Sequence, residues 1–249
     1  MSEIITLNGR ETSVENFNRT LMYGEGVFET FRYNNGLPKF IKKHYQRLIK
    51  GAKTLGIPSI TEEDYIYYIE ETIKQAEGND LYVKTILVSE GNSEFSVLPV
   101  ASKLLVIVRP FKPMQKEKIS LTLAPFKVHS SDPLLKIKST NYMRNVLGKR
   151  YARENGFDDV VFLNENDEIT ETSSANIFWI KGRFLYTPSL DCGILPGITR
   201  EAVINEAKKD GWTVVEGRFY LDDLKKADYI FVTNALNGII RVEKFNFIY

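Results

Sequence analysis

Three polar motifs between residues 135 and 200 organise the chain. The stretch opens with Leu135-Lys136-Ile137-Lys138-Ser139-Thr140-Asn141-Tyr142 and continues through Glu168-Ile169-Thr170-Glu171-Thr172-Ser173-Ser174-Ala175-Asn176-Ile177-Phe178. It closes with Leu195-Pro196-Gly197-Ile198-Thr199-Arg200. We interpret the three motifs as a lysine that can form an imine, an acid that can keep a ring nitrogen charged, and a helix start that can bind a phosphate.

Lys138, rather than Lys136, is the lysine that we expect to react. A lysine that forms an imine must be held out of bulk water, so that its neutral amine is available. Lys138 follows the apolar Ile137 and precedes a predicted helix, an element boundary at which a side chain can be aimed. A solvated surface lysine is the simpler interpretation of this residue alone, and the two other motifs favour the reactive one.

The second and third motifs complement this lysine. Glu171 precedes four small or polar residues, so backbone could approach a flat ring beside it, although a surface acid in a turn would look the same. A carboxylate facing a pyridine nitrogen keeps that nitrogen protonated, and the ring then withdraws electrons from a substrate carbanion. Gly197 and Thr199 precede a predicted helix, with Thr199 as its expected N-cap and Arg47 as a further phosphate ligand. Together the motifs suggest pyridoxal 5'-phosphate (PLP) as cofactor.

Composition sets the broad class of the protein. The 249 residues carry 33 basic and 32 acidic side chains, a net charge of +1, which gives no reason to expect nucleic acid or an anionic membrane. One cysteine (Cys192) and two histidines (His44 and His129) make a protein-built metal site unexpected. With no apolar run near 18 residues and no charged-then-apolar leader, we expect a cytoplasmic protein.

Hydrophobic periodicity predicts an α+β fold. Alternation predicts strands over 27–33, 81–88, 103–108, 119–124, 159–163, 176–180, 183–186, 212–215 and 229–232, and a final strand within 239–249. A hairpin at Asn8-Gly9 would follow a strand over 4–7. Helical spacing predicts helices over 42–55, from the Thr61 cap to Gly78, 141–154 and 200–209. The helices form blocks rather than alternating with strands, which favours α+β over a regular βαβ repeat.

The best linker candidate divides the chain into two unequal parts. Residues 111–118 hold Pro113 and three lysines but few apolar side chains, and Pro110 precedes them. We therefore expect a small N-terminal α+β domain over 1–110 and a larger C-terminal domain over 119–249 that carries the reactive lysine.

The chain resembles the fold-type IV PLP enzymes, also called the class IV aminotransferase family. The resemblance covers nearly the whole chain and rests on five ordered motifs: Tyr23-Gly24-Glu25-Gly26-Val27-Phe28-Glu29-Thr30, His44-Tyr45-Gln46-Arg47-Leu48, Lys138-Ser139-Thr140-Asn141-Tyr142, Glu171-Thr172-Ser173-Ser174-Ala175-Asn176-Ile177-Phe178 and Leu195-Pro196-Gly197-Ile198-Thr199-Arg200. The family includes branched-chain and D-amino-acid aminotransferases and 4-amino-4-deoxychorismate lyase. The resemblance implies two α+β domains with PLP between them, and a homodimer whose partner loop borders the site.

The resemblance also implies roles for single residues. Lys138 matches the lysine that forms the imine with PLP and then moves the α-proton, and Thr30 matches a threonine that the lyases place near the substrate. The implied cofactor-binding residues are Lys138, Glu171 (ring nitrogen), Tyr142 (phenolic oxygen), Arg47, Ile198 and Thr199 (phosphate) and Ala235. Ala235 replaces a hydroxyl residue of some members, so only its backbone could serve. The implied substrate-binding residues are Arg32, Tyr82, Lys84 and Leu236.

The choice of reaction depends on residues outside the cofactor motifs. Thr30 favours 4-amino-4-deoxychorismate lyase, which eliminates pyruvate and leaves 4-aminobenzoate, because branched-chain enzymes usually have glycine there. Against it, lyases commonly carry an arginine-glycine loop after the strand at 81–88, whereas this loop contains Glu90 and Glu94. Arg32 and Lys84 are alternative basic groups. An aminotransferase of branched-chain or D-amino acids, with 2-oxoglutarate or pyruvate as partner, is the alternative.

Two other classes fit the sequence less well. A non-catalytic binding protein on the same fold would be expected to have lost Lys138 or Glu171, and both are intact. A metal hydrolase or nucleotide-binding protein would need histidine clusters, a Walker loop or a GxGxxG element, none of which the sequence contains.

Overall fold

An antiparallel sheet forms the centre of the N-terminal half. The computed structural model of the protein describes residues 6–7, 10–11, 18–92 and 94–247. The strands of this sheet, in spatial order, are β3 (Gly26–Asn34), β4 (Asp80–Glu90) and β5 (Ala101–Pro110). Burial alternates strictly along β4, so the sheet turns one face to a core, as the alternating sequence pattern predicted.

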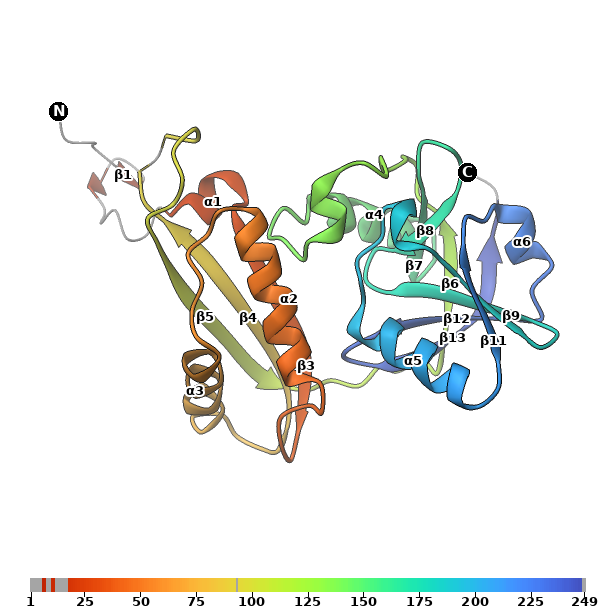
Figure 1. The fold of residues 1–249 in the computed structure, drawn as a ribbon, viewed down its shortest axis with the longest axis horizontal. Helices are drawn as coiled ribbons and strands as arrows, with labels where there is room; N and C mark the ends of the chain where they lie inside the picture. Colours follow the sequence, from red (N-terminus) through yellow and green to blue (C-terminus); the bar gives the residue numbers. More distant parts are fainter. Residues whose placement is uncertain (1–5, 8–9, 12–17, 93, 248–249) are drawn as a thin grey trace.

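Two amphipathic helices cover that face, α2 (Ile41–Thr54) and α3 (Glu62–Ile73) (Figure 1). Thr61 caps α3 by accepting a hydrogen bond from the Asp64 N–H, which confirms the cap expected from the sequence. The helices and the sheet bury a common core that includes Phe31, Leu48 and Tyr65.

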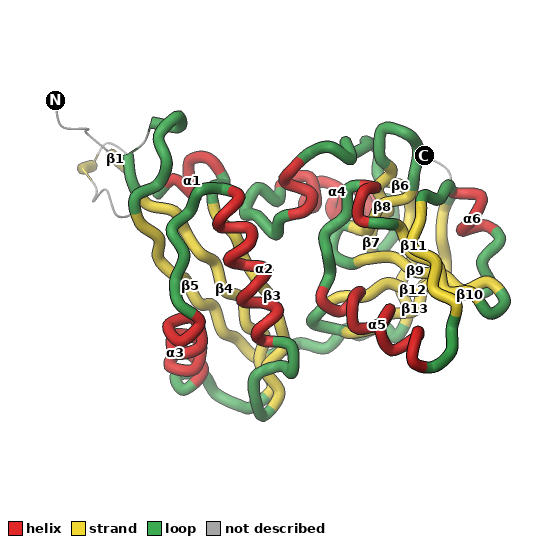
Figure 2. The backbone as a smooth tube through the Cα atoms, viewed as in Figure 1, coloured by secondary structure: helices red, strands yellow, loops and turns green. Residues whose placement is uncertain are grey.

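The C-terminal half is a larger sheet that closes on itself (Figure 2). Its strands, in chain order, are β6 (Lys118–Leu123), β7 (Asp159–Leu163), β8 (Ile169–Thr172), β9 (Asn176–Lys181), β10 (Phe184–Pro188), β11 (Thr213–Gly217), β12 (Tyr229–Asn234) and β13 (Gly238–Asn246). Their spatial order is β11-β10-β9-β12-β13-β6-β7-β8, and β8 also pairs with β9. This last pairing gives a barrel-like sheet around Trp179, Ile177 and Leu121.

Helices pack outside this sheet. The longer two are α4 (Met143–Glu154) and α5 (Ile198–Lys209), and α6 (Leu221–Lys225) and the 3₁₀ turn at Leu190–Cys192 are short. The short helix α1 (Arg19–Tyr23) packs instead against β4 of the N-terminal sheet, and the 3₁₀ turn at Pro133–Lys136 contacts the cores of both halves. Gly148 lets α4 lie close to the sheet, because a Cβ there would stand 2.7 Å from Val160 Cγ2. None of the described helices is both long and apolar enough to cross a membrane.

The α+β fold class predicted from the sequence is confirmed, with corrections at some element ends. The expected Thr199 N-cap is wrong: α5 begins at Ile198, and its N-cap is Gly197. The helices α1 and α6 were not predicted, because five residues are too short for a periodic pattern. At the N-terminus Thr6–Leu7 pairs with Arg10–Glu11, whereas the expected turn at residues 8–9 lies outside the described residues.

The segment that carries Lys138 packs against the N-terminal half although it follows the linker. Leu134 and Ile137 join the core formed by β3, α2 and α3. Ser139 forms an isolated antiparallel bridge with Val27 of β3. In Figure 1 this green segment accordingly reaches from the C-terminal part toward β3 and α2. The reactive lysine predicted from the sequence is thereby placed between the two sheets.

Candidate active site

A cavity of about 440 Å³ lies where the two sheets face each other. That volume is typical of sites for small molecules and cofactors. Its walls come from β3, β4, the segment at 135–145, the turn after β8, the start of α5 and the loop between β12 and β13. It collects the following predicted residues: Thr30, Arg47, Tyr82, Lys84, Lys138, Tyr142, Glu171, Ile198, Thr199, Ala235 and Leu236.

Lys138 projects into this cavity among aromatic rings. Its Nζ stands 4.6 Å from the ring centroid of Phe28 and 5.9 Å from that of Tyr142. Burial, together with the positive charge of Arg47, lowers the pKa of the Lys138 amine to about 8. A neutral amine is therefore far more abundant near neutral pH than for a lysine in water, as an imine-forming lysine requires.

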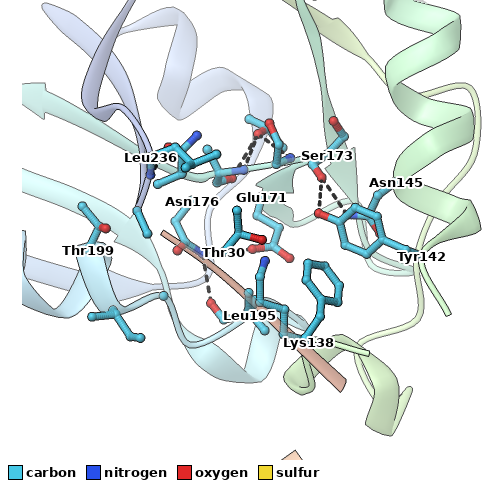
Figure 3. A pocket seen from close by; sticks show the side chains of 18 of the residues that line it. Thr30, Lys138, Tyr142, Asn145, Glu171, Ser173, Asn176, Leu195, Thr199 and Leu236 are labelled. Carbon is cyan, nitrogen blue, oxygen red and sulfur yellow. Dashed lines mark hydrogen bonds between the residues drawn. The ribbon is translucent and has the colours of Figure 1, made fainter. Parts of the chain in front are cut away.

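Glu171, on β8, reaches the same space from the opposite sheet (Figure 3). Burial raises the pKa of the Glu171 carboxyl to about 8, although the Leu195 N–H and the charge of Lys138 act against this rise. Asn176 Nδ2 donates to Glu171 Oε2 (2.9 Å) and to the Leu195 carbonyl (3.0 Å), which fixes the orientation of the acid. A positive charge placed beside Glu171 would lower its pKa again.

Tyr142 and Asn145 form a second side of the cavity through one shared acceptor. The Tyr142 hydroxyl (3.0 Å) and Asn145 Nδ2 (2.8 Å) both donate to the Ser173 carbonyl, as Figure 3 shows. Burial raises the pKa of the Tyr142 hydroxyl, so it stays protonated and can donate a hydrogen bond. The Tyr142 and Phe28 rings form a T-shaped contact, with a distance of 5.3 Å between the ring centroids.

The start of α5 lines the cavity and has no side-chain cap for its first N–H groups. Its N-cap Gly197 offers no side chain to accept the first N–H groups, and Ile198 and Thr199 line the cavity. Glycine is required because a Cβ on residue 197 would stand 2.0 Å from Asn176 Oδ1. Unpaired N–H groups at the positive end of a twelve-residue helix suit a phosphate.

Arg47 approaches this helix start, but much of its guanidinium is already bonded. Nε and Nη2 donate to the two oxygens of Glu29 (both 2.7 Å), and Nη1 donates to the Pro196 carbonyl (3.1 Å). Glu29 also contacts His44 Nδ1 at 2.7 Å and is fully buried. Burial would raise the pKa of Glu29, but Arg47 and His44 outweigh it and hold that pKa at about 2. A phosphate contact from Arg47 therefore has to use its remaining N–H bonds.

The substrate-side candidates do not all meet in the cavity. Lys84 and Thr30 are paired across β4 and β3, and Lys84 Nζ stands 4.5 Å from the Phe28 ring centroid. Burial lowers the pKa of Lys84. Arg32 is absent from the residues that line the cavity: it forms a bidentate ion pair with Asp80 (2.6 and 2.7 Å) and lies over the Phe111 ring. We accordingly do not assign Arg32 to the substrate.

The end of β12 and the loop between β12 and β13 form the far side of the cavity. Ala235 and Leu236 line the cavity there, beside Thr233. Asn234 Oδ1 accepts the N–H groups of Leu236 (3.1 Å) and Asn237 (2.9 Å), so the loop keeps a tight turn. Ala235 has no side-chain donor, so any contact from it to a ligand would have to use its backbone.

The sequence interpretation did not assign roles to several residues of the site. Asn145, Ser173 and Asn176 hold Tyr142 and Glu171 in place, and Phe28 lies under both lysines. Asn145 could have been found from its position within the first turn of the helix that follows Lys138. The Ser173 contact uses a backbone carbonyl, for which the side-chain pattern carries no signal.

The groups that line the cavity fit PLP. A partly neutral amine, a buried acid opposite it and an uncapped helix start supply one partner each for an aldehyde, a ring nitrogen and a phosphate. Two buried polar atoms of lining residues, Asn145 Oδ1 and Thr233 Oγ1, have no hydrogen-bond partner among the described residues, so the wall can still bind polar groups. Among the described residues no cluster of histidine, cysteine or acidic side chains could hold a metal ion.

Known proteins resemble this chain in fold and in sequence. Aminodeoxychorismate lyase of Bacillus subtilis is 31% identical over 98% of this chain and 88% of its own length. A protein of Legionella pneumophila, solved as a putative 4-amino-4-deoxychorismate lyase, superposes with a TM-score of 0.88 at 31% identity, covering 92% of this chain and 86% of that one. The branched-chain aminotransferase of Thermoproteus uzoniensis superposes with a TM-score of 0.85 at 28% identity, covering 96% and 85%.

The family model for amino-transferase class IV matches residues 26–245, a range that includes Lys138, Glu171 and the start of α5. The matched range therefore contains all of the residues that line the cavity between the two sheets. The chain belongs to the class IV aminotransferase family and is an enzyme that uses PLP.

Proposed function

We propose that the protein is a 4-amino-4-deoxychorismate lyase, which releases pyruvate from its substrate to form 4-aminobenzoate in folate biosynthesis. The observation that carries this proposal is the pair formed by Thr30 and Lys84 on the cavity wall, beside Lys138. The pair offers a hydroxyl and a desolvated cation on the same wall. The cation can pair with a carboxylate of the substrate, and the hydroxyl can donate to a leaving group that must accept a proton. The similarity to the lyases of Bacillus subtilis and Legionella pneumophila supports it.

The chain's own residues have distinct tasks in this reaction. Bound PLP supplies an electron-withdrawing ring that stabilises negative charge on the carbon next to the substrate amine. Glu171 would face the ring nitrogen, and the N–H groups at the start of α5 would hold the phosphate, with help from the free N–H bonds of Arg47. Lys138 Nζ would hold the cofactor and would accept the α-proton of the substrate. The Thr30 hydroxyl is proposed to hydrogen-bond the departing pyruvate group.

The acidic loop after β4 does not oppose this proposal. Glu90 pairs with Lys103 at 2.8 Å, and Glu94 Oε1 accepts from Ser96. Neither acid lines the cavity. Lys84, which does line it, can therefore meet a substrate carboxylate without competition from these two side chains.

The second candidate function is an aminotransferase of branched-chain or D-amino acids. Its specific support is the apolar character of the wall at Ala235 and Leu236, together with the similarity to the Thermoproteus uzoniensis aminotransferase. The two reactions share the loss of the α-proton to Lys138. They differ in whether a leaving group departs or a proton returns, so a product assay separates them.

A homodimer is proposed as the working assembly. Helix α1 and the loop after β4 expose a group of large apolar side chains, and Arg19 joins the two segments by donating to the carbonyls of Asn92 and Glu94. The exposed side chains are Leu21, Met22, Tyr23, Phe95, Leu98 and Val100. A second copy of the chain is the proposed partner, since an exposed apolar group of this kind marks an interaction surface.

For the reaction itself, the purified enzyme is incubated with aminodeoxychorismate while 4-aminobenzoate is measured, and in parallel with amino acids and 2-oxoglutarate or pyruvate. We expect 4-aminobenzoate, and a loss of about 10²- to 10⁴-fold in Lys138→Ala, because the proton acceptor is removed. Lys136→Ala, an exposed neighbour, is the matched control and should keep the wild-type rate. A new amino acid without 4-aminobenzoate would instead establish the aminotransferase.

For substrate binding, Lys84→Met should raise KM for aminodeoxychorismate about 10- to 100-fold, because a charge-assisted hydrogen bond contributes about 1.5–3 kcal/mol. PLP binding, measured by absorbance titration, should change little. Lys103→Met removes a lysine that is paired with Glu90 away from the cavity, and should leave KM unchanged. An unchanged KM in Lys84→Met would contradict the assignment of Lys84.

For pH dependence, the rate at which cofactor-free protein attaches PLP should follow the neutral fraction of Lys138. Because the pKa of Lys138 is lowered to about 8, this fraction rises about tenfold between pH 7 and 9 and then levels off. A lysine with an ordinary pKa would gain about a hundredfold over the same interval without levelling. Stopped-flow absorbance between pH 6.5 and 10 distinguishes the two curves, and the second would refute the lowered pKa.

For the assembly, analytical ultracentrifugation of the wild type should give the mass of two chains. Phe95→Asp places a charge in the exposed apolar group and should shift the protein toward one chain. Phe184→Asp, at an exposed aromatic residue on β10, is the control and should not. A wild type that sediments as a single chain would rule the dimer out.

A further inference from the structure

We propose that Thr140 is a positioning residue, which fastens Lys138 to the backbone of Gly24 and Gly26 at the start of β3. The inference rests on the proposed function in so far as Lys138 is the reactive amine. It adds a component to the site: a latch, made of Thr140 and the segment Gly24–Gly26, that decides where the amine stands relative to Glu171.

The backbone around Lys138 is bonded to β3. The Phe28 N–H donates to the Lys138 carbonyl at 2.8 Å, and the Thr140 N–H donates to the Gly26 carbonyl at 2.9 Å. These two bonds flank the antiparallel bridge between Val27 and Ser139. Residues 138–140 therefore behave as a short extra strand on β3, and in Figure 3 the pale red ribbon of β3 passes beside Lys138.

The Thr140 side chain extends this attachment beyond the strand. Its Oγ1 lies 2.6 Å from the Gly24 carbonyl and 3.3 Å from the Gly26 carbonyl, and donates toward both. A hydroxyl that bridges two carbonyls resists rotation of the chain directly after the lysine. Because Lys138 lies two residues earlier in an extended segment, the direction of its side chain depends on this contact.

The two glycines of the latch allow the close approach. Gly24 has a φ of +67°, and a Cβ on it would stand 3.3 Å from Asn141 Cα. A Cβ on Gly26 would stand 2.8 Å from Thr20 Cγ2 and 3.0 Å from Thr140 Oγ1. Side chains at either position would push the lysine segment away from β3. The glycines of the Gly24-Glu25-Gly26 motif are thus needed for close packing of the lysine segment, independently of any contact with the cofactor.

An ion pair between the buried Arg19 and the partly exposed Glu25 supports the backbone of the latch. Arg19, only 1% exposed, donates through Nε to Glu25 Oε2 at 2.5 Å. The Glu25 carbonyl accepts from Thr20 Oγ1 (2.7 Å) and from Ser89 Oγ (2.6 Å). The backbone to which Thr140 is tied is therefore rigidly connected to α1 and β4. A rigid support is needed if a positioning residue is to fix a reacting group.

The consequence for the site is that the amine and the acid are carried by different sheets. Glu171 is fixed to the barrel-like sheet through β8, whereas Lys138 is fixed to β3. The latch therefore sets their relative position. Misplacing a reacting group by about 1 Å can cost about 100-fold in rate, so loss of the latch should be visible in kinetics.

The test compares Thr140→Val with Thr140→Ser in the PLP-loaded enzyme. Thr140→Val keeps the shape but loses the donor, and we expect kcat to fall about 10- to 100-fold with KM changed less than about threefold. The apparent pKa of the visible absorption of bound PLP should shift as well, which a merely structural role would not cause. Thr140→Ser retains the hydroxyl and should restore both quantities to near the wild-type values.

A second pair of variants covers the case in which Thr140→Val does not fold. Gly26→Ala should disturb the contact from the opposite side and give the same spectral shift. Gly36→Ala is the matched control, because a Cβ there meets nothing within 4 Å. Wild-type kcat and wild-type spectral titration in Thr140→Val or in Gly26→Ala would overturn the latch while leaving the proposed function intact. A wild type that binds no PLP would overturn the proposed function itself.

Discussion

Backbone hydrogen bonds between β3 and the segment at 138–140 are the constraint on which the site depends. The lysine follows the linker in sequence, yet the Phe28 N–H and the Gly26 carbonyl tie it to the N-terminal sheet. The acid opposite it belongs to the barrel-like sheet. The cavity lies between these two sheets, and each contributes one of the two groups to which we assign the chemistry.

Burial tunes the two groups from opposite directions. Lys138 has its pKa lowered and Glu171 has its pKa raised, and both arrive at about 8, because the charged form of each is penalised in the same poorly solvated space. The Phe28 ring lies beside the Lys138 amine, and the Asn176 amide donates to the Glu171 carboxyl. A cofactor that brings a basic ring nitrogen to Glu171 and an aldehyde to Lys138 would remove the energetic cost of burying these two side chains.

A second network, formed by Glu29, His44 and Arg47, connects the N-terminal sheet to the segment before α5. Glu29 is fully buried, and its charge is acceptable only because Arg47 and His44 satisfy its oxygens. Arg47 then reaches the Pro196 carbonyl, just before the helix start that would bind phosphate. On the surface, Lys43 of α2 pairs with Glu201 of α5 at 2.6 Å. The N-terminal sheet is thus fastened to the proposed phosphate site as well as to the lysine.

Sequence reasoning was sufficient where a pattern is local. Alternation and helical spacing located most of the strands and the longer helices, although not β8, and Thr61 marked the start of α3. The prediction of Thr199 as a cap was wrong, because the clash that requires glycine at residue 197 comes from Asn176, which is distant in sequence. The five-residue helices α1 and α6 are held by tertiary contacts and capping, for which no periodicity exists to be read.

The sequence by itself determined the family, the cofactor and the three motifs, because each motif carries its chemistry in side chains that are close together along the chain. Only the tertiary structure decided which basic residue enters the cavity. Lys84 and Arg32 lie on the same face of the N-terminal sheet, yet Lys84 faces Phe28 and Arg32 is neutralised by Asp80. It also decided that Lys138 is attached to β3, since backbone hydrogen bonds between distant segments leave no mark in the order of residues.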